Sequence, residues 1–520
     1  MMKRLYVILL TAFLALPAFA QTARIKIDTD RKIGEIDKNL YSNFTEHLGR
    51  CIYGGLYDPE SSQADEAGLR KDVLQAIRDL NVSITRYPGG NFVSNYHWLD
   101  GVGPNRKPRL ELAWQRMESN EFGTDEFMDF ARKVGTEPYF AINLGTGTIE
   151  EAQWWVEYCN IKEGPYYAEL RRKYGHDEPY NIKYWGLGNE MDGDWQMGQL
   201  SPMDYAKKAR EAAKIMTYTD PSIKLIASGS SNYTPGANPD EWNRTVLDYL
   251  DGFVDYIALH MYVGNANNNY YDFLATPMIM EERTQLVKGM IREYNKSDRP
   301  IKIAWDEYNV WYRARDDASS VGIHALEEHY NLEDALVIAG FLNCFVRNAD
   351  IVKMANMAQL VNVIAPIFVE DDKMYLQTIY YPLQLFANNM KGQSLDVFVD
   401  CEKYNTSEDF SLGRNEVSAS ITDVPYLDVT AALDGDELIV CVVNRNKDKA
   451  IATDIICQQA KFSGPVEVYE INGPDIKAEN TVSKTTVTTQ KKADLKNPGN
   501  ANLRYSFPAH SITMLKGKVK

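Results

Sequence analysis

Between residues 40 and 385, short apolar runs with strand propensity alternate with stretches of helical periodicity, and this alternation constrains the fold more than any other feature. Eight runs have the length and composition of strands: residues 40–44, 83–86, 138–143, 182–187, 224–228, 254–259, 301–305 and 350–354. Strand followed by helix, repeated eight times, predicts a (β/α)8, or TIM, barrel. A doubly wound open sheet stays as the alternative, because short runs can be miscounted.

The segments between these runs have the spacing of amphipathic helices. Residues 73–80 and 127–134 carry apolar side chains at i, i+3, i+4 and i+7. A further helix is expected after Ser201-Pro202, because serine is a common N-cap residue and proline suits the first helical turn. Residues 333–345 are apolar over most of a helical surface, which predicts a buried helix.

After about residue 386 the helical pattern stops. Runs rich in Val, Thr and Ile, such as 437–443, 465–471 and 481–489, are separated by Asn, Asp, Gly and Lys. This pattern predicts a β-sandwich, similar to a jelly roll, over residues 386–520. Residues 21–40 precede the barrel domain at 41–385, but Ile25 and Ile27 alternate with polar residues. We therefore expect this segment to pair with the C-terminal sandwich.

The first twenty residues have the pattern of a secretory signal peptide. Lys3 and Arg4 precede an apolar stretch from Leu5 to Leu16, and Ala18-Phe19-Ala20 matches a cleavage site. The pattern predicts export to the periplasm or beyond the cell, without membrane insertion once the signal is removed. The alternative is a buried N-terminal helix, which the polar sequence from Gln21 disfavours.

The chain is acidic, with 56 Lys and Arg against 72 Asp and Glu and a formal net charge of −16. Such a surface repels nucleic acid and anionic lipid, so a neutral partner is favoured. Six cysteines are widely scattered and have no zinc-type spacing. We expect them to be buried as small apolar residues, and the sequence leaves any disulfide connectivity open.

Polar and aromatic residues follow seven of the predicted strands, at the end where (β/α)8 barrels place their active sites. They are residues 45–50, 86–91, Asn143, Asn189 with Glu190, residues 260–262, Asp306 with Glu307, and Gln359. Each has an ordinary structural explanation, such as a turn, a core histidine or a buried ion pair. Seven strand ends in one register nevertheless predict a single site.

Glu190 and Glu307 are the predicted catalytic pair, because they follow the fourth and seventh strands. Two carboxyl groups about 5–5.5 Å apart are what a retaining glycosidase needs, one as nucleophile and one as acid/base. We assign Glu307 as nucleophile, kept ionised by Arg86 and Tyr262, and Glu190 as the acid/base. The alternative for each glutamate is a buried ion pair with an arginine.

Aromatic residues gather near the predicted site, and sugars stack their C–H faces on such rings. They are Trp98, Trp114, Trp305, Tyr308 and Trp311, although a core role is equally plausible for each. Gly89-Gly90 is only a weak phosphate-binding signal, since no complete phosphate-loop motif surrounds it. His47 and His260 lack the ligand spacing of a metal site. We therefore do not predict a metal site.

The motifs resemble those of the α-L-arabinofuranosidases of glycoside hydrolase family 51. The matching stretches are residues 43–57, 86–98, 112–114, 185–192, 260–262, 305–311 and 358–366. The resemblance implies a retaining mechanism without a cofactor, and commonly a homo-oligomer. It implies that Glu190 is the acid/base and Glu307 the nucleophile, with a substrate-binding set of Glu46, Arg86, Asn91, Trp114, Asn189, His260, Tyr262, Trp311 and Gln359.

The expected activity is exo-hydrolysis of non-reducing terminal α-L-arabinofuranosyl groups from arabinan, arabinoxylan or derived oligosaccharides. Two alternatives remain. The same fold could act on β-xylosides or as an endoglucanase, because fold does not determine substrate. The chain could also be a non-catalytic carbohydrate-binding protein, although such a protein needs neither glutamate.

Overall fold

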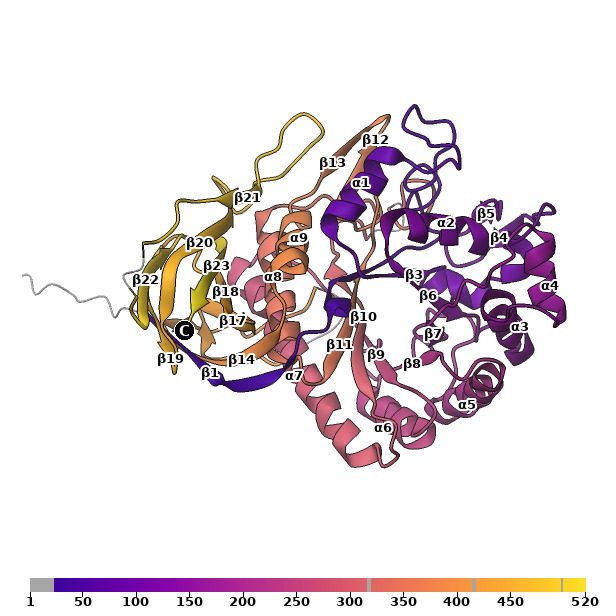
Figure 1. Cartoon of the computed structure of the whole chain (residues 1–520), viewed down its shortest axis with the longest axis horizontal. Helices are drawn as coiled ribbons and strands as arrows, with labels where there is room; N and C mark the ends of the chain where they lie inside the picture. The colour runs from indigo at the N-terminus through magenta and orange to yellow at the C-terminus, as the bar shows by residue number, and fades with distance from the viewer. Residues whose placement is uncertain (1–22, 316–318, 414–417, 497–498) are drawn as a thin grey trace, which may run out of the picture.

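The computed structural model describes residues 23–315, 319–413, 418–496 and 499–520. Figure 1 shows two units, a ring of strands and helices and, beside it, a β-sheet that contains the C-terminus. The predicted signal peptide, residues 1–20, lies outside the described residues.

Eight parallel strands close into a barrel in the order β10-β11-β2-β3-β6-β7-β8-β9. Their bounds are β2 Ser42–Phe44, β3 Ile84–Tyr87, β6 Glu137–Ile142, β7 Tyr184–Leu187, β8 Lys224–Ser228, β9 Tyr256–Val263, β10 Lys302–Val310 and β11 Val352–Ala358. Each corresponds to one predicted run, so the barrel is confirmed and the open-sheet alternative is wrong. Closure brings the carboxyl ends of all eight strands around one mouth.

Three strands are longer than predicted. Strands β9, β10 and β11 continue through polar residues that the sequence placed beyond the strand ends. Glu307 pairs with His260, and Asn309 with Tyr262, in the β9–β10 ladder. The polar side chains remain in the sheet because they bond to one another at the barrel mouth.

The helices cover the outside of the barrel (Figure 1). They are α1 Lys71–Leu80, α2 Thr124–Val134, α3 Ile149–Asn160, α4 Tyr166–Lys173, α5 Pro202–Thr219, α6 Pro239–Leu250, α7 Tyr270–Tyr294, α8 Leu332–Arg347 and α9 Tyr380–Asn389. Helix α5 begins as predicted, with the Ser201 side chain accepting a bond from the backbone N–H of Asp204. Helix α8 is buried from Leu332 to Val346, because it lies between the barrel and the sheet.

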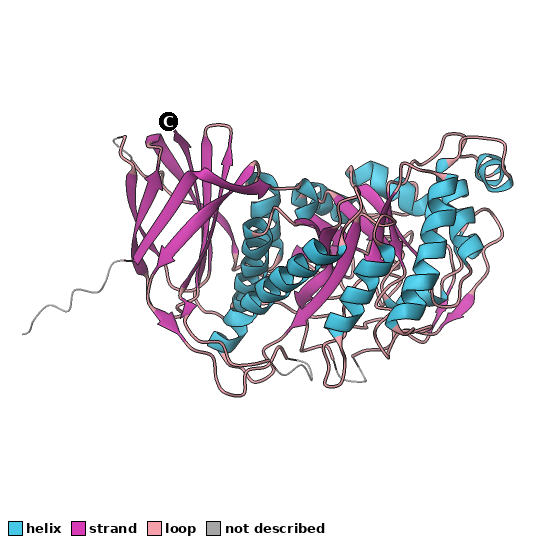
Figure 2. Cartoon of the chain, turned by 90° about the horizontal axis from the view of Figure 1, so that it is seen from below, coloured by secondary structure: helices cyan, strands magenta, loops and turns pink. Residues whose placement is uncertain are grey.

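A nine-stranded sheet forms the second unit, in the order β21-β20-β23-β18-β17-β14-β1-β19-β22. Its strands are β1 Ala23–Glu35, β14 Gln393–Asp400, β17 Leu427–Asp434, β18 Glu437–Asn444, β19 Ile451–Gln458, β20 Phe462–Asn472, β21 Thr488–Lys491, β22 Asn502–Phe507 and β23 Ser511–Val519. Side chains from distant strands of this order share one apolar core, as in a sandwich. Figure 2 shows helices standing between this sheet and the barrel.

Strand β18 shows why the sheet packs on both faces. Leu438, Val440 and Val442 enter the core of the sheet domain, whereas the alternate residues 439, 441 and 443 join the core shared with the barrel. Successive side chains of a strand point to opposite faces, so an apolar run can serve two cores. The sequence pattern of β18 is therefore continuous rather than alternating.

The N-terminal strand β1 lies inside this sheet. It pairs antiparallel with β14 and parallel with β19, with Ile25 opposite Val399 and Ile455. Figure 1 shows the indigo strand beside the orange and yellow strands of the C-terminal part.

One predicted strand, residues 481–489, is mostly a loop. Only its last two residues belong to β21, and Thr481 and Lys484 form an isolated bridge. The side chain of Asn480 accepts bonds from the backbone N–H groups of Thr486 and Val487, both at 2.8 Å. Those bonds fold the segment back on itself instead of leaving its N–H groups to a neighbouring strand.

In the described part of the chain, three two-stranded antiparallel sheets stand apart from these two units: β4 Arg109–Glu111 with β5 Arg116–Glu118, β12 Ile367–Glu370 with β13 Lys373–Leu376, and β15 Lys403–Tyr404 with β16 Val424–Pro425. All six cysteines are free thiols, and five of them are buried while Cys401 is half-buried. Within residues 23–315, 319–413, 418–496 and 499–520, none of the helices has both the length and the apolar character needed to cross a membrane.

Candidate active site

A cavity of about 600 Å³ opens at the carboxyl ends of the barrel strands. Its lining includes eight of the predicted site residues: Glu46, Asn91, Trp114, Glu190, Tyr262, Glu307, Trp311 and Gln359. Arg86, Asn189 and His260 are not in the lining but lie behind it: Arg86 contacts Glu307, His260 contacts Glu190, and Asn189 accepts a bond from Arg86. The barrel therefore brings all the predicted residues to one place, in two layers.

The two predicted catalytic glutamates face each other in this cavity. One carboxylate oxygen of Glu190, one of Glu307 and a ring nitrogen of His260 all lie within 4.8 Å of one another. This separation agrees with the short spacing of retaining glycosidases and leaves too little room for the water of an inverting enzyme. Glu190 has φ 44°, a left-handed conformation that is uncommon for a residue other than glycine and is often found at functional sites.

Glu307 is fixed by two donors, one on each oxygen. Arg86 Nη1 donates to Oε1 at 2.7 Å, and the Tyr262 hydroxyl donates to Oε2 at 2.7 Å. All three side chains are buried. Charge-assisted bonds of this length fix the orientation of the carboxylate.

Arg86 is the fixed positive charge behind the pair. It is fully buried, donates to Asn189 Oδ1 at 2.5 Å and lies 3.4 Å from Asp306 Oδ2. Burial by itself would lower the pKa of Arg86, but the charges of Asp306 and Glu307 outweigh burial and raise it. The guanidinium also lies 4.7 Å from the centre of the Phe44 ring. Arg86 therefore stays charged and joins Glu307 to Asn189.

Glu190 is held differently. Trp195 Nε1 donates to its Oε2 at 2.5 Å, and His260 Nδ1 lies 2.9 Å from its Oε1. Trp195 lines the cavity and was missed in the sequence. The one sequence feature that points to Trp195 is its position five residues after Glu190. That spacing does not distinguish Trp195 from the other tryptophans of the chain.

His260 lies between the two carboxylates, with Nδ1 also 3.6 Å from Glu307 Oε2. Burial would lower the pKa of His260, but the negative charge of Glu307 and the contact with Glu190 raise it. The imidazole is therefore a proton-carrying neighbour of both acids rather than part of the cavity wall.

Glu46 is a third buried carboxyl group in the cavity. Burial raises the pKa of Glu46 to about 8, and the nearby charge of Glu307 adds to the rise. Its Oε1 accepts from the backbone N–H of Phe92 at 3.0 Å and from Trp114 Nε1 at 3.2 Å, while Gln359 Nε2 donates to Oε2 at 2.8 Å. At neutral pH Glu46 is therefore a neutral group that can donate as well as accept.

The Gly89-Gly90 pair allows the backbone to pass close to these acids. A Cβ atom on Gly89 would lie 2.5 Å from Glu46 Cγ, and one on Gly90 would lie 3.0 Å from Glu307 Oε1. Close approach, not phosphate binding, accounts for the two glycines.

The cluster of Glu190, His260 and Glu307 is the one group in the described part of the chain with the side chains to hold a metal ion. Its ligand atoms are already engaged: Glu307 accepts from Arg86 and Tyr262, and Glu190 from Trp195. A guanidinium 2.7 Å from Glu307 also opposes a second cation. His47, the other histidine considered, bonds elsewhere to Glu118 and Tyr87.

Only some of the predicted aromatic residues reach the cavity. Trp114 and Trp311 line it, whereas Trp98, Trp305 and Tyr308 are buried in the core. Tyr308 packs against helix α8 rather than the site, with its ring 4.9 Å from that of Phe345. Sequence proximity to Glu307 was misleading here, because neighbouring strand residues point to opposite faces.

A (β/α)8 barrel with two glutamates facing each other at the carboxyl ends of its strands defines a glycoside hydrolase. A family model described as the α-L-arabinofuranosidase 1 domain matches residues 76–276, and one described as the α-L-arabinofuranosidase C-terminal domain matches residues 306–511. The chain is 41% identical to the probable α-L-arabinofuranosidase C of Aspergillus clavatus, over 96% of this chain and 98% of that protein.

Solved structures agree. The α-L-arabinofuranosidase from Thermotoga maritima, crystallised with arabinose, has a TM-score of 0.87 and 39% identity, covering 96% of this chain and 100% of that one. The chain belongs to the α-L-arabinofuranosidases of glycoside hydrolase family 51. It is therefore an enzyme and not a carbohydrate-binding protein without activity. A bifunctional glucanase-xylanase from a metagenome, at 14% identity and a TM-score of 0.60, shares the fold alone.

The prediction of export to the periplasm or beyond is wrong. A relative from Bacillus subtilis, 41% identical over 89% of this chain and 93% of that protein, is named an intracellular exo-α-(1→5)-L-arabinofuranosidase, as is one from Halalkalibacterium halodurans at 42% identity. An apolar stretch followed by alanines is a short pattern, and it did not outweigh a relationship that extends over most of the chain.

Proposed function

We propose that Glu307 is the nucleophile and Glu190 the acid/base of a retaining α-L-arabinofuranosidase that removes terminal arabinofuranosyl groups. The observation that carries the proposal is the separation of the two carboxylates, within 4.8 Å, in unlike surroundings. Glu307 is paired with a buried arginine, which favours the anion that a nucleophile must be. Glu190 contacts the neutral indole of Trp195 and the imidazole of His260, a group that can itself exchange a proton, which suits a residue that gains and loses a proton.

In the first step, a Glu307 carboxylate oxygen attacks the anomeric carbon. The bond from that carbon to the leaving oxygen breaks, and its electron pair stays with the oxygen as Glu190 delivers a proton to it. The product is an ester between the arabinosyl group and Glu307. Forming the ester removes the negative charge near Glu190, so Glu190 can then hold its own charge.

In the second step, Glu190 takes a proton from water, and the water oxygen attacks the anomeric carbon. The ester bond breaks, Glu307 regains its charge and arabinose leaves with its original configuration. Arg86 and Tyr262 then bind the restored carboxylate again, without any need to reorganise.

The remaining predicted residues serve the sugar or the pair. Glu46, Asn91 and Gln359 face the cavity and supply hydroxyl-binding groups, while Trp114 and Trp311 form its apolar walls. Arg86 and His260 act through the two glutamates, and Asn189 acts through Arg86. The names of the Bacillus and Halalkalibacterium relatives refer to α-(1→5) linkages, which supports arabinan fragments as substrates beside arabinoxylan fragments.

We also propose that the chain divides into a barrel domain at residues 41–385 and a sandwich formed by 21–40 and 386–520, and that it assembles into a homo-oligomer. Leu110 and Met117, 58% and 66% exposed on the β4–β5 hairpin, support a subunit contact, because large apolar side chains seldom gather on a free surface. Light scattering after size-exclusion chromatography would test the assembly.

The test of the catalytic assignment is Glu307→Ala assayed on an aryl α-L-arabinofuranoside. We expect turnover to be abolished, and azide to restore it by attacking from the vacated face, which gives the β-configured arabinosyl azide. Near-normal activity of the variant without azide would refute the assignment, and an α-configured azide would reverse the roles of the two glutamates.

A further inference from the structure

The five residues that follow strand β10, residues 311–315, form an exit segment that borders the cavity. Trp311 and Arg315 line the cavity, and the Arg315 guanidinium lies 4.1 Å from the centre of the Trp311 ring. The Trp311 ring stands edge-on to that of Tyr262, at 5.6 Å and 78°. Tyr262 in turn donates a hydrogen bond to Glu307. A shift of the exit segment would therefore be passed on to Glu307 through the rings of Trp311 and Tyr262.

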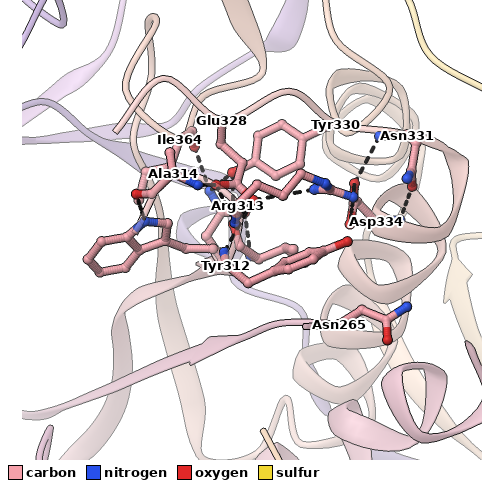
Figure 3. Close-up of polar contacts among 12 residues, drawn as sticks. Asn265, Tyr312, Arg313, Ala314, Glu328, Tyr330, Asn331, Asp334 and Ile364 are labelled. Carbon is pink, nitrogen blue, oxygen red and sulfur yellow. Dashed lines mark hydrogen bonds and ion pairs between the residues drawn. The ribbon is translucent and has the colours of Figure 1, made fainter. Parts of the chain in front are cut away.

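The exit segment no longer pairs with the barrel sheet, and three of its backbone N–H groups donate to one buried carboxylate instead. The N–H of Trp311 still donates to Val263 O at 2.8 Å. The next three N–H groups, of Tyr312, Arg313 and Ala314, all donate to Glu328, at 3.2, 3.0 and 2.8 Å (Figure 3). Successive N–H groups that converge on one anion form a strong, directional site.

Glu328 is itself fixed from the far side. It is fully buried, and Gln377 donates to its backbone carbonyl at 2.9 Å. Gln377 also accepts from the N–H of Tyr330, whose hydroxyl donates to Val310 O at 2.8 Å. The backbone of Glu328 is therefore held by Gln377, which does not line the cavity.

Arg313 links this carboxylate to helix α8. Its Nη1 lies 3.3 Å from Glu328 Oε1, and its Nη2 lies 3.1 Å from Asp334 Oδ2 (Figure 3). Asp334 in turn accepts from the N–H of Asn331, the N-cap residue of α8, at 2.8 Å. The exit segment is thus fastened to the start of a helix that is buried along its length.

We propose that Glu328 is a positioning residue for the active site: it holds the exit segment so that Trp311 supports Tyr262 and, through it, Glu307. Glu328 is not in the cavity lining and acts only through other residues. The inference rests on the function proposed above. A purely structural role, as the buried partner of Arg313, is the competing explanation, and the two differ in whether the effect of Glu328 depends on Trp311.

A double-mutant cycle between Glu328→Gln and Trp311→Leu distinguishes the positioning role from the purely structural role. The readout is kcat/KM on an aryl arabinofuranoside with a good leaving group. We expect Glu328→Gln to lower kcat/KM at least tenfold in the wild-type background. In the Trp311→Leu background we expect a change of less than twofold, because the residue through which Glu328 acts is already gone. If Glu328→Gln does not fold, Glu328→Asp keeps the charge and should show the same dependence with a smaller loss.

Glu333→Gln is the matched control, since Glu333 is an equally buried acid five residues away that pairs with Lys477 and not with the exit segment. It should lower Tm and leave kcat/KM in both backgrounds within twofold. An equal loss from Glu328→Gln in both backgrounds, or a lowered Tm with unchanged kcat/KM, would overturn the proposal. Turnover by the wild type tests the proposed function separately, so the two can fail independently.

Discussion

At the scale of single residues, the two glutamates differ in what surrounds them rather than in chemistry. Glu307 accepts from a guanidinium and a hydroxyl, whereas Glu190 lies between an indole and an imidazole. Two carboxyl groups in different surroundings can take different parts in one reaction. The proposed roles therefore rest on the partners that each strand end supplies.

Glu46 provides a pH-dependent test at this scale. Its pKa is about 8 in the folded protein against an ordinary value of 4.5, so between these values the folded state keeps a proton that the unfolded chain releases. Wild-type stability should therefore fall as pH rises from about 4.5 to 8. Glu46→Gln cannot ionise, so its free energy of unfolding relative to wild type should rise across that window, by at most about 5 kcal/mol at about 1.4 kcal/mol per pKa unit, and its Tm should rise with it.

Differential scanning calorimetry between pH 5 and 9 measures the difference in Tm between Glu46→Gln and the wild type. The Gln359 amide can accommodate the substitution, because its Oε1 has no hydrogen-bond partner and could turn toward the new amide. Glu60→Gln, at an exposed position, is the matched control and should leave the difference in Tm unchanged with pH. Parallel curves for wild type and Glu46→Gln would contradict the assignment of a neutral Glu46.

At the scale of elements, the sequence predicted best those helices and strands whose formation depends on residues within the element itself. The eight strands follow from apolar runs, and the start of α5 from its Ser-Pro cap. The true ends of β9 and β10 did not follow, because polar residues stay in the sheet only when the opposite strand ends supply their partners. For the same reason the sequence did not identify Trp195 as a site residue and wrongly placed Tyr308 in the site. The face of the barrel to which a side chain points depends on segments that are distant in the sequence.

The turn after β3 offers a test of how elements shape the site. Gly90→Ala would put a methyl group 3.0 Å from Glu307 Oε1, and that carboxylate is already held by Arg86 and Tyr262. We expect kcat to fall between about ten- and a hundredfold, the cost of displacing a reacting group by a fraction of an ångström to an ångström. Tm should change little.

Gly289→Ala in helix α7 is the control, because nothing lies within 4 Å of its added Cβ. It should keep full activity and gain about 1 kcal/mol of stability from helix propensity. Unchanged kcat in Gly90→Ala would mean that the backbone does not limit the position of Glu307.

At the scale of the whole molecule, a buried ion cluster joins the barrel to the sheet. Arg347, the last residue of α8, donates to Asp428 Oδ1 of β17 at 2.6 Å, and Arg445 lies 3.3 Å from the same carboxylate. Burial would raise the pKa of Asp428, but the two arginines outweigh it and lower it. Helix α8 contacts both β17 of the sheet and β10, the strand that carries Glu307, so the sheet supports the barrel on the side of Glu307.

Asp428→Asn should destabilise the protein by about 3–5 kcal/mol, because it leaves Arg347 buried with less compensation. A lowered pKa means that Asp428 stabilises the fold above its ordinary pKa and loses that effect as pH falls through its folded value. The Tm difference from wild type should therefore be constant from pH 5 to 7 and shrink below about pH 4. Asp396→Asn, which breaks an exposed pair with Arg31, should cost less than about 1 kcal/mol. Equal Tm losses from the two variants would contradict a buried interdomain cluster.

The central claim is a covalent arabinosyl ester on Glu307 that Glu190 helps to form and to release. Glu190→Ala, mixed with a dinitrophenyl α-L-arabinofuranoside, tests it directly: the good leaving group departs without an acid, but hydrolysis of the ester still needs the base. Mass spectrometry of the digested protein should then find one arabinosyl group on the peptide that contains Glu307. Unmodified protein after a full burst of dinitrophenol, or the sugar on another residue, would contradict the account.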